Sequence, residues 1–166
     1  GVDFITIGNE NFCCGMVYAM FGYLDLFIDQ TNRDLEYYMN LRPRPKELLL
    51  HCPGCYTVHM FDMTRYGIEL PFNQLEKMQN PMKIMHVTQY ILKLIKEGKI
   101  ELKNEVPIKV AYNDSCSTGR RNELTSSPIY DEPREILASI PGVEVVKTDF
   151  DRENALCCGL FATKTY

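Results

Sequence analysis

The sequence has no apolar run that approaches the roughly 18 residues of a membrane-spanning helix, so no membrane span is expected. It also has no excess of positive charge, since 18 lysines and arginines face 22 aspartates and glutamates for a formal net charge of −4. Without a basic stripe, nucleic acid is not expected as a partner. The composition is typical of a globular protein, and we expect a cytoplasmic one that reaches a membrane only through a partner.

Segments with strand character alternate with segments with helical character along the 166 residues. The expected strands are residues 2–7, 47–51, 83–87, 108–112 and 143–146. The expected helices are residues 16–41 with a break near Gly22, residues 56–65, residues 88–97 with Thr88 as N-cap, and a helix within residues 128–139. This alternation predicts an α/β fold with a mostly parallel sheet and flanking helices.

Cysteine is the residue type whose placement is most informative. The odd count of 7 argues against a closed disulfide framework, and all of them fall within four short motifs. The motifs are Cys13-Cys14-Gly15, Cys52-Pro53-Gly54-Cys55, the single Cys116, and Cys157-Cys158-Gly159. The intervals are similar, with 37 residues (15–51) after the first pair and 40 residues (117–156) before the second. Each motif follows an expected strand, and the carboxyl ends of parallel strands are where such sheets place their sites.

The chemistry of these motifs favours a soft metal. Thiolates suit iron–sulfur clusters, zinc or copper(I). At a strand-to-helix junction, backbone N–H groups and the helix dipole would stabilise the thiolates of Cys52 and Cys55. The side chains of vicinal cysteines diverge, so they serve two irons of one cluster more readily than one tetrahedral zinc. The glycine that follows each pair permits positive φ and a close approach of the backbone to a cofactor. We therefore predict that all seven cysteines are ligands of an iron–sulfur cluster.

Two alternatives stay open at this point. A structural zinc could be held by Cys13, Cys14, Cys52 and Cys55, which would make the chain a binding module. A reversible dithiol of Cys52 and Cys55 would make it a thiol–disulfide protein.

The three histidines are expected to be structural residues. His51 is predicted to face the core, and His59 and His86 are not assigned as ligands.

The cysteine motifs resemble the cysteine-rich CCG domain family. That domain occurs in the B and D subunits of heterodisulfide reductase, in iron–sulfur subunits of glycolate and lactate oxidation systems, and in one type of succinate dehydrogenase or fumarate reductase. Its unit is a lone cysteine, then Cys-Cys-Gly, then Cys-x-x-Cys, and the unit is usually present twice. Three further segments are similar to the family: residues 130–134, 140–144 and 152–155.

The resemblance implies two pseudo-repeated units, each incomplete in this sequence. Residues 1–80 would be the C-terminal part of the first unit and residues 81–166 the N-terminal part of the second, so we expect a fragment of a longer protein. The implied cofactor is a noncubane [4Fe-4S] cluster in an oxidoreductase subunit that transfers electrons and reduces a disulfide, similar to the B subunit of heterodisulfide reductase. The implied partners are redox subunits with iron–sulfur or flavin groups, and the implied substrate is a small disulfide or an organic acid.

The sequence departs from the family around Cys116. The family often has His-Asp-Pro-Cys-His there, whereas this chain has Asn113-Asp114-Ser115-Cys116-Ser117. Both histidines and the proline are replaced, so no proton-donor role is carried over and no catalytic residue is assigned.

Overall fold

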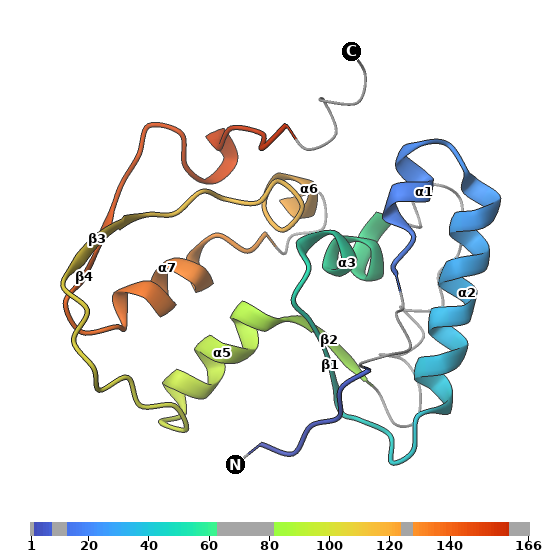
Figure 1. The fold of residues 1–166 in the computed structure, drawn as a ribbon, viewed down its shortest axis with the longest axis horizontal. Coiled ribbons are helices and arrows are strands. Elements are labelled where there is room, and N and C mark those ends of the chain that lie inside the picture. Colours follow the sequence, from blue (N-terminus) through green and yellow to red (C-terminus); the bar gives the residue numbers. More distant parts are fainter. Residues whose placement is uncertain (1, 8–12, 63–81, 124–127, 160–166) are drawn as a thin grey trace. The chain divides into compact units, whose positions relative to one another are not determined.

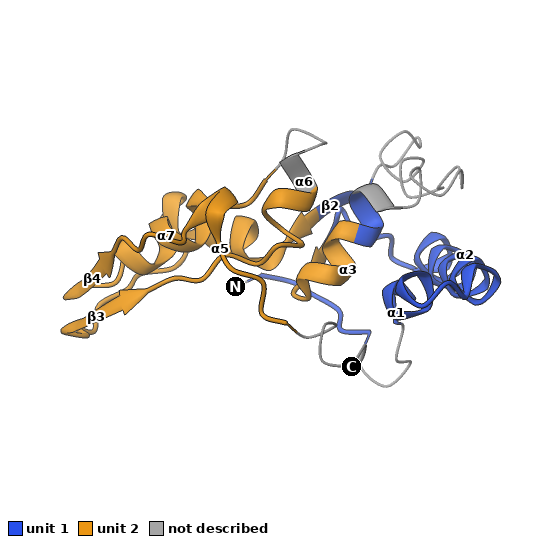
Figure 2. Cartoon of the chain, turned by 90° about the horizontal axis from the view of Figure 1, so that it is seen from above, with its two compact units in different colours: residues 1–48, 58–84 blue, residues 49–57, 85–166 orange. Residues whose placement is uncertain are grey.

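A computed structural model describes residues 2–7, 13–62, 82–123 and 128–159. The chain divides into two compact units, coloured separately in Figure 2. Unit 1 comprises residues 1–48 and 58–84, and unit 2 comprises residues 49–57 and 85–166. The following paragraphs treat each unit by itself.

Unit 2 contains a pair of parallel strands, β3 (Ile108–Ala111) and β4 (Val143–Val146). Their register aligns Ile108 with Val143 and Ala111 with Val146. Helix α7 (Asp131–Ala138) lies between them in sequence and packs against β4, and α5 (Val87–Lys96) packs against α7 (Figure 1). Two shorter elements, α6 (Arg120–Glu123) and the 3-10 turn η3 (Arg152–Asn154), follow β3 and β4. Parallel strands joined through a helix confirm the α/β class.

Helix α5 begins and ends with local caps. The N-cap is His86 and not Thr88 as expected: its Nδ1 accepts the Thr88 N–H at 3.4 Å, while Gln89 Oε1 accepts the His86 N–H at 3.1 Å. This is a capping box, and the sequence rules overlooked it because histidine is not a usual capping residue. The C-terminus is a Schellman motif, in which Gly98 takes a φ of 69°.

Unit 1 contains α1 (Met16–Met20) and α2 (Leu24–Asn40), which pack against each other. The expected break at Gly22 is confirmed, because this residue has a φ of 82° and closes α1 with a Schellman motif. One face of α2 supplies buried side chains, including Phe27, Leu35 and Tyr38. The ring of Tyr38 lies 5.8 Å from that of His59.

Strands β1 (Glu47–Leu50) and β2 (Lys83–His86) form a second two-stranded sheet. After β1 the chain enters α3 (Pro53–Thr57) and continues as one π-helical stretch, η1 (Val58–Asp62). This helical segment begins earlier than the expected residue 56, because Pro53 is suited to the first turn of a helix. Its expected end at residue 65 lies outside the described residues.

The prediction of a buried strand over residues 2–7 is wrong. These residues have no secondary structure, and Phe4 and Ile5 are 77% and 56% exposed. Apolar periodicity reports a local preference only, whereas a strand also needs a neighbour for its backbone hydrogen bonds. No described strand pairs with this segment.

The described strands form two pairs instead of one larger sheet. The division into repeat units at residues 1–80 and 81–166 stays a prediction, as does the pseudo-repeat itself. Among the described helices, none has both the length and the apolar character needed to cross a membrane.

Candidate metal centre

The structure distributes the seven cysteines between the two units. Cys13 and Cys14 lie in unit 1, and the other five lie in unit 2. All seven are reduced thiols. The exposed ones are Cys13, Cys157 and Cys158, whereas Cys14 is buried and the remaining three are half-buried.

Both Cys-Cys-Gly triplets end in the same backbone conformation. Gly15 has a φ of 71° and Gly159 a φ of 75°, a region that favours glycine. The expected positive φ after each cysteine pair is therefore confirmed. Gly15 also caps α1, and a Cβ there would lie 2.9 Å from Phe27 Cδ2. In the second triplet, the Gly159 N–H donates to Cys157 Sγ at 3.4 Å.

The Cys-x-x-Cys motif occupies the start of α3, as expected. The Cys52 carbonyl accepts the Tyr56 N–H at 3.0 Å, so Cys52 immediately precedes the first helical turn. Burial raises the pKa of the Cys52 thiol, and the neighbouring Cys55 thiol adds to this effect. The backbone N–H groups of Cys55 and Gly54 oppose it. The two thiols are close enough to hydrogen-bond, so the pair can bind one metal or act as a dithiol.

A buried hydroxyl connects this helix to the loop that carries Cys116. Thr57 Oγ1 lies 2.9 Å from the Pro53 carbonyl oxygen and 2.6 Å from the Ser117 carbonyl oxygen. Thr57 is fully buried, so its single proton is shared between these two acceptors. Sequence analysis missed Thr57, because it and Ser117 are 60 residues apart.

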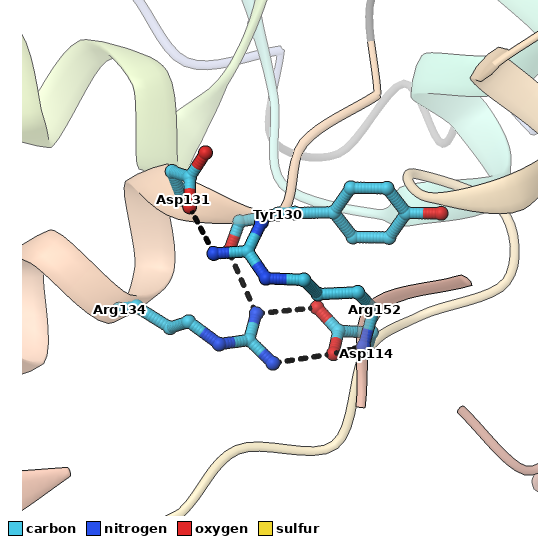
Figure 3. A network of polar contacts seen from close by, with 5 residues as sticks. All are labelled: Asp114, Tyr130, Asp131, Arg134 and Arg152. Atoms are coloured by element: carbon cyan, nitrogen blue, oxygen red, sulfur yellow. Dashed lines mark hydrogen bonds and ion pairs between the residues drawn. The ribbon is translucent and has the colours of Figure 1, made fainter. Parts of the chain in front are cut away.

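The buried carboxylate of Asp114 accepts several hydrogen bonds near the same loop. Asp114 Oδ1 and Oδ2 accept Arg134 Nη1 at 2.7 Å and Nη2 at 2.6 Å, and Oδ2 also accepts the Arg152 N–H at 2.7 Å (Figure 3). Arg134 Nη1 donates as well to the Tyr130 carbonyl at 2.7 Å. The Arg134 guanidinium lies 5.3 Å from the centre of the Tyr112 ring. Side chains and backbone groups from three segments thus form one network around Asp114.

Sequence analysis missed this network, although it had singled out the segments that form it. Residues 130–134 and 152–155 were noted for their likeness to the family, and the structure joins both to Asp114. Asp131 lies in the first turn of α7, and its carboxylate also accepts Arg152 Nη2. The charged residues of these segments are visible in the sequence, but only the fold brings them together in pairs.

The electrostatics of the network keep Asp114 ionised. Burial alone would raise its pKa, but hydrogen bonds from Arg134 and from the Arg152 N–H lower the pKa below the usual range. The same pairing raises the pKa of Arg134. With both carboxylate oxygens engaged, Asp114 is a structural acceptor rather than a proton donor.

The burial of the histidines differs from the expectation at one position. His59 and His86 are buried, but His51 is exposed and not directed to the core. Burial lowers the pKa of His86, and the charge of nearby His51 lowers it further while the His51 backbone acts in the opposite sense.

The donor set fits a thiolate-bound metal cofactor in its chemistry: sulfur ligands, glycines in left-handed backbone, and N–H groups directed at sulfur. Within the described ranges, no group of three or more histidine, cysteine, aspartate or glutamate side chains is arranged to hold a metal ion. The assignment of the seven cysteines as ligands therefore stays a prediction.

Comparison with known proteins identifies the C-terminal third. Residues 110–165, which carry Cys116, the Asp114 network and the second triplet, match the family model of the CCG cysteine-rich domain. This segment is therefore similar to the CCG cysteine-rich domain. The predicted family is thereby confirmed.

Curated relatives extend the likeness to nearly the whole chain. The D subunit of the dihydromethanophenazine:CoB–CoM heterodisulfide reductase from Methanosarcina mazei is 32% identical over 96% of this chain and 36% of its own length. The EtfAB:quinone oxidoreductase of Syntrophomonas wolfei is 29% identical over 96% of this chain and 20% of its own length. The probable iron-sulfur-binding oxidoreductase FadF of Bacillus subtilis is 28% identical over 96% of this chain and 20% of its own length.

The chain thus spans about a third or less of the length of these relatives. No solved structure matches it significantly.

Proposed function

We propose that this chain is part of an iron–sulfur oxidoreductase subunit that moves electrons to or from a small disulfide, a quinone or an organic acid. The observation that carries the proposal is the arrangement within unit 2. Three cysteine-bearing segments are connected there by two part-buried contacts, Thr57 to Ser117 and Asp114 to Arg152. The names of the relatives supply the chemical class, because they are oxidoreductases and FadF is described as iron-sulfur-binding.

The ligands in this proposal are the seven cysteines: Cys13, Cys14, Cys52, Cys55, Cys116, Cys157 and Cys158. A cluster bound to them, of the noncubane [4Fe-4S] type, would supply electron transfer and iron that can bind a substrate thiolate. The chain itself contributes donors and their orientation. The start of α3 directs N–H groups at Cys52, and the left-handed Gly159 directs its N–H at Cys157 Sγ. Such N–H groups stabilise negative charge on sulfur.

The partners in this proposal are further redox subunits with iron–sulfur or flavin groups. The relatives support this because several are named as subunits of larger enzymes. Reduction of a disulfide similar to that of heterodisulfide reductase is one form of the proposed activity, and oxidation of an organic acid or a quinol is the other.

The test is the content of iron, zinc and acid-labile sulfide in the full chain purified without oxygen, together with its visible spectrum. We expect iron and sulfide in equal amounts and broad visible absorption. Cys55→Ser and Cys157→Ser should lower the iron content, whereas Ser117→Ala, whose carbonyl rather than side chain makes the described contact, should not. Zinc without sulfide would instead identify a structural zinc module.

A thiol–disulfide function is the second candidate, because the thiols of Cys52 and Cys55 lie within hydrogen-bonding reach of each other. It predicts no metal and a reversible two-electron oxidation of this pair. In that case Cys52→Ser abolishes redox activity and Cys157→Ser has no effect.

A further inference from the structure

Asp114 connects three segments that are far apart in the sequence of the CCG domain. Its carboxylate binds the side chain of Arg134, 20 residues away on α7, and the backbone N–H of Arg152, 38 residues away. Only 3% of Asp114 is exposed. An ionised carboxylate that accepts three short hydrogen bonds in a buried place is among the stronger polar anchors available to a protein.

The Arg152 end of this contact has an unusual backbone. Arg152 is the one residue other than glycine with a positive φ in the described ranges, at 53°. For a residue with a side chain, this conformation is strained and persists only when its surroundings impose it. The Asp114 carboxylate imposes it by accepting the Arg152 N–H, and Asp131 accepts its guanidinium.

The strained residue opens the turn that leads into the second cysteine pair. The Ala155 N–H donates to the Arg152 carbonyl at 3.2 Å, and Ala155 is buried. Cys157 follows two residues later. The direction in which the chain approaches Cys157 and Cys158 therefore depends on the backbone of Arg152.

The Asp114 end of the contact lies closer still to a cysteine in the sequence. Cys116 is two residues further on, in a loop that is closed by hydrogen bonds from the Gly119 N–H to the Ser115 carbonyl at 2.9 Å and from the Arg121 N–H to the Cys116 carbonyl at 3.0 Å. One carboxylate thus binds the backbone just before the second cysteine pair and itself belongs to the loop of Cys116.

We infer that Asp114 is a positioning residue that holds the loop of Cys116 and the turn before the Cys157-Cys158 pair in a fixed relation to each other. The inference rests on the proposed cofactor function and adds to it the group that sets the ligand geometry. Arg134 fixes the carboxylate, and the carboxylate fixes the turn at Arg152.

The first measurement is amide hydrogen exchange on the metal-free full chain. Asp114→Asn keeps the side-chain shape but removes the charge, and we expect exchange in residues 152–158 to become about tenfold faster, as for a weakened charged hydrogen bond. Asp131→Asn, which removes the charge of the exposed partner of Arg152, should change exchange there by less than about threefold. Helix α5 serves as the internal reference for global unfolding.

The second measurement is the iron content and the electron paramagnetic resonance spectrum of protein prepared without oxygen. Asp114→Asn should bind less iron than the natural chain or give an altered spectrum, and Asp131→Asn should do neither. Unchanged exchange and an unchanged iron spectrum in Asp114→Asn would overturn the inference. If no variant and not even the natural chain binds iron, the proposed function fails, while the exchange data still decide whether Asp114 holds the turn.

A further variant covers the case in which Asp114→Asn does not fold. Arg134→Lys keeps the positive charge but loses the two-pronged contact with the carboxylate. We expect faster exchange confined to residues 152–158. Exchange that is unchanged, or that rises equally in α5, would reject a positioning role.

Discussion

The hydroxyl of Thr57 and the carbonyl of Ser117 lie 2.6 Å apart, and through them the Cys-x-x-Cys helix is bonded to the loop of Cys116. Thr57 is fully buried and the contact is part-buried, so its loss deprives the Ser117 carbonyl of this partner. We expect Thr57→Val, which is nearly isosteric, to lower the free energy of unfolding by about 1–3 kcal/mol.

Urea denaturation measures this effect. Thr57→Ser retains the hydroxyl and should preserve more of the stability than Thr57→Val, apart from the loss of a methyl group. Equal destabilisation by the two variants would mean that packing, not the hydrogen bond, is what Thr57 contributes.

A second prediction concerns the glycine of the first triplet. Gly15→Ala must place a Cβ at a φ of 71° and 2.9 Å from the buried ring of Phe27, so it carries both a backbone and a steric cost. Gly22→Ala is the matched control, with a φ of 82° and no atom within 4 Å of the added Cβ. We expect Gly22→Ala to cost about 1 kcal/mol and Gly15→Ala at least about 1 kcal/mol more. Thermal or urea unfolding of both variants tests this difference, and equal losses would contradict it.

A third prediction concerns the pH dependence of stability. Burial lowers the pKa of His86, and a protonated Nδ1 could no longer accept the Thr88 N–H. Above the ordinary pKa of about 6.5 the ring is neutral in the folded and unfolded states, so its stabilising contribution is complete. Below that value the unfolded chain takes up a proton that the folded state resists, and the free energy of unfolding falls until the folded pKa is passed.

The control for this prediction is His86→Asn, which keeps an N-cap acceptor without a titrating ring. As the pH falls from neutral to mildly acidic, the free energy of unfolding should decrease more steeply for the natural chain than for His86→Asn. The ring of Tyr56 lies 5.6 Å from that of His86, and His51 acts on His86 electrostatically. Parallel pH profiles would show that His86 does not contribute.

A fourth prediction concerns thiol reactivity in the metal-free protein. Burial raises the pKa of Cys52, so less of it is thiolate at mildly alkaline pH, whereas Cys157 and Cys158 are exposed. We expect iodoacetamide to modify Cys157 and Cys158 first and Cys52 and the buried Cys14 later, as followed by peptide mass spectrometry. After unfolding in urea the four rates should converge. A Cys52 that reacts in the folded protein as fast as Cys157 would contradict this.

Sequence reasoning located the elements whose boundaries are encoded by neighbouring residues. The break at Gly22, the end of α5 at Gly98 and the bounds of β4 follow from turn residues and short apolar runs. It failed for residues 2–7, because periodicity cannot reveal whether a partner strand exists. It also passed over His86 as a cap, because its hydrogen bonds use a side chain that seldom has this role.

By itself, the sequence determined the chemical character of this protein: seven cysteines in four motifs, each pair followed by a glycine whose lack of a Cβ allows the left-handed backbone. Only the tertiary structure decided what holds these motifs in place. Asp114, Arg134 and Arg152 meet across 20 and 38 residues, and Thr57 meets Ser117 across 60. Such contacts depend on how the chain packs, since buried polar groups must find partners wherever the fold brings them, and no local pattern records that choice.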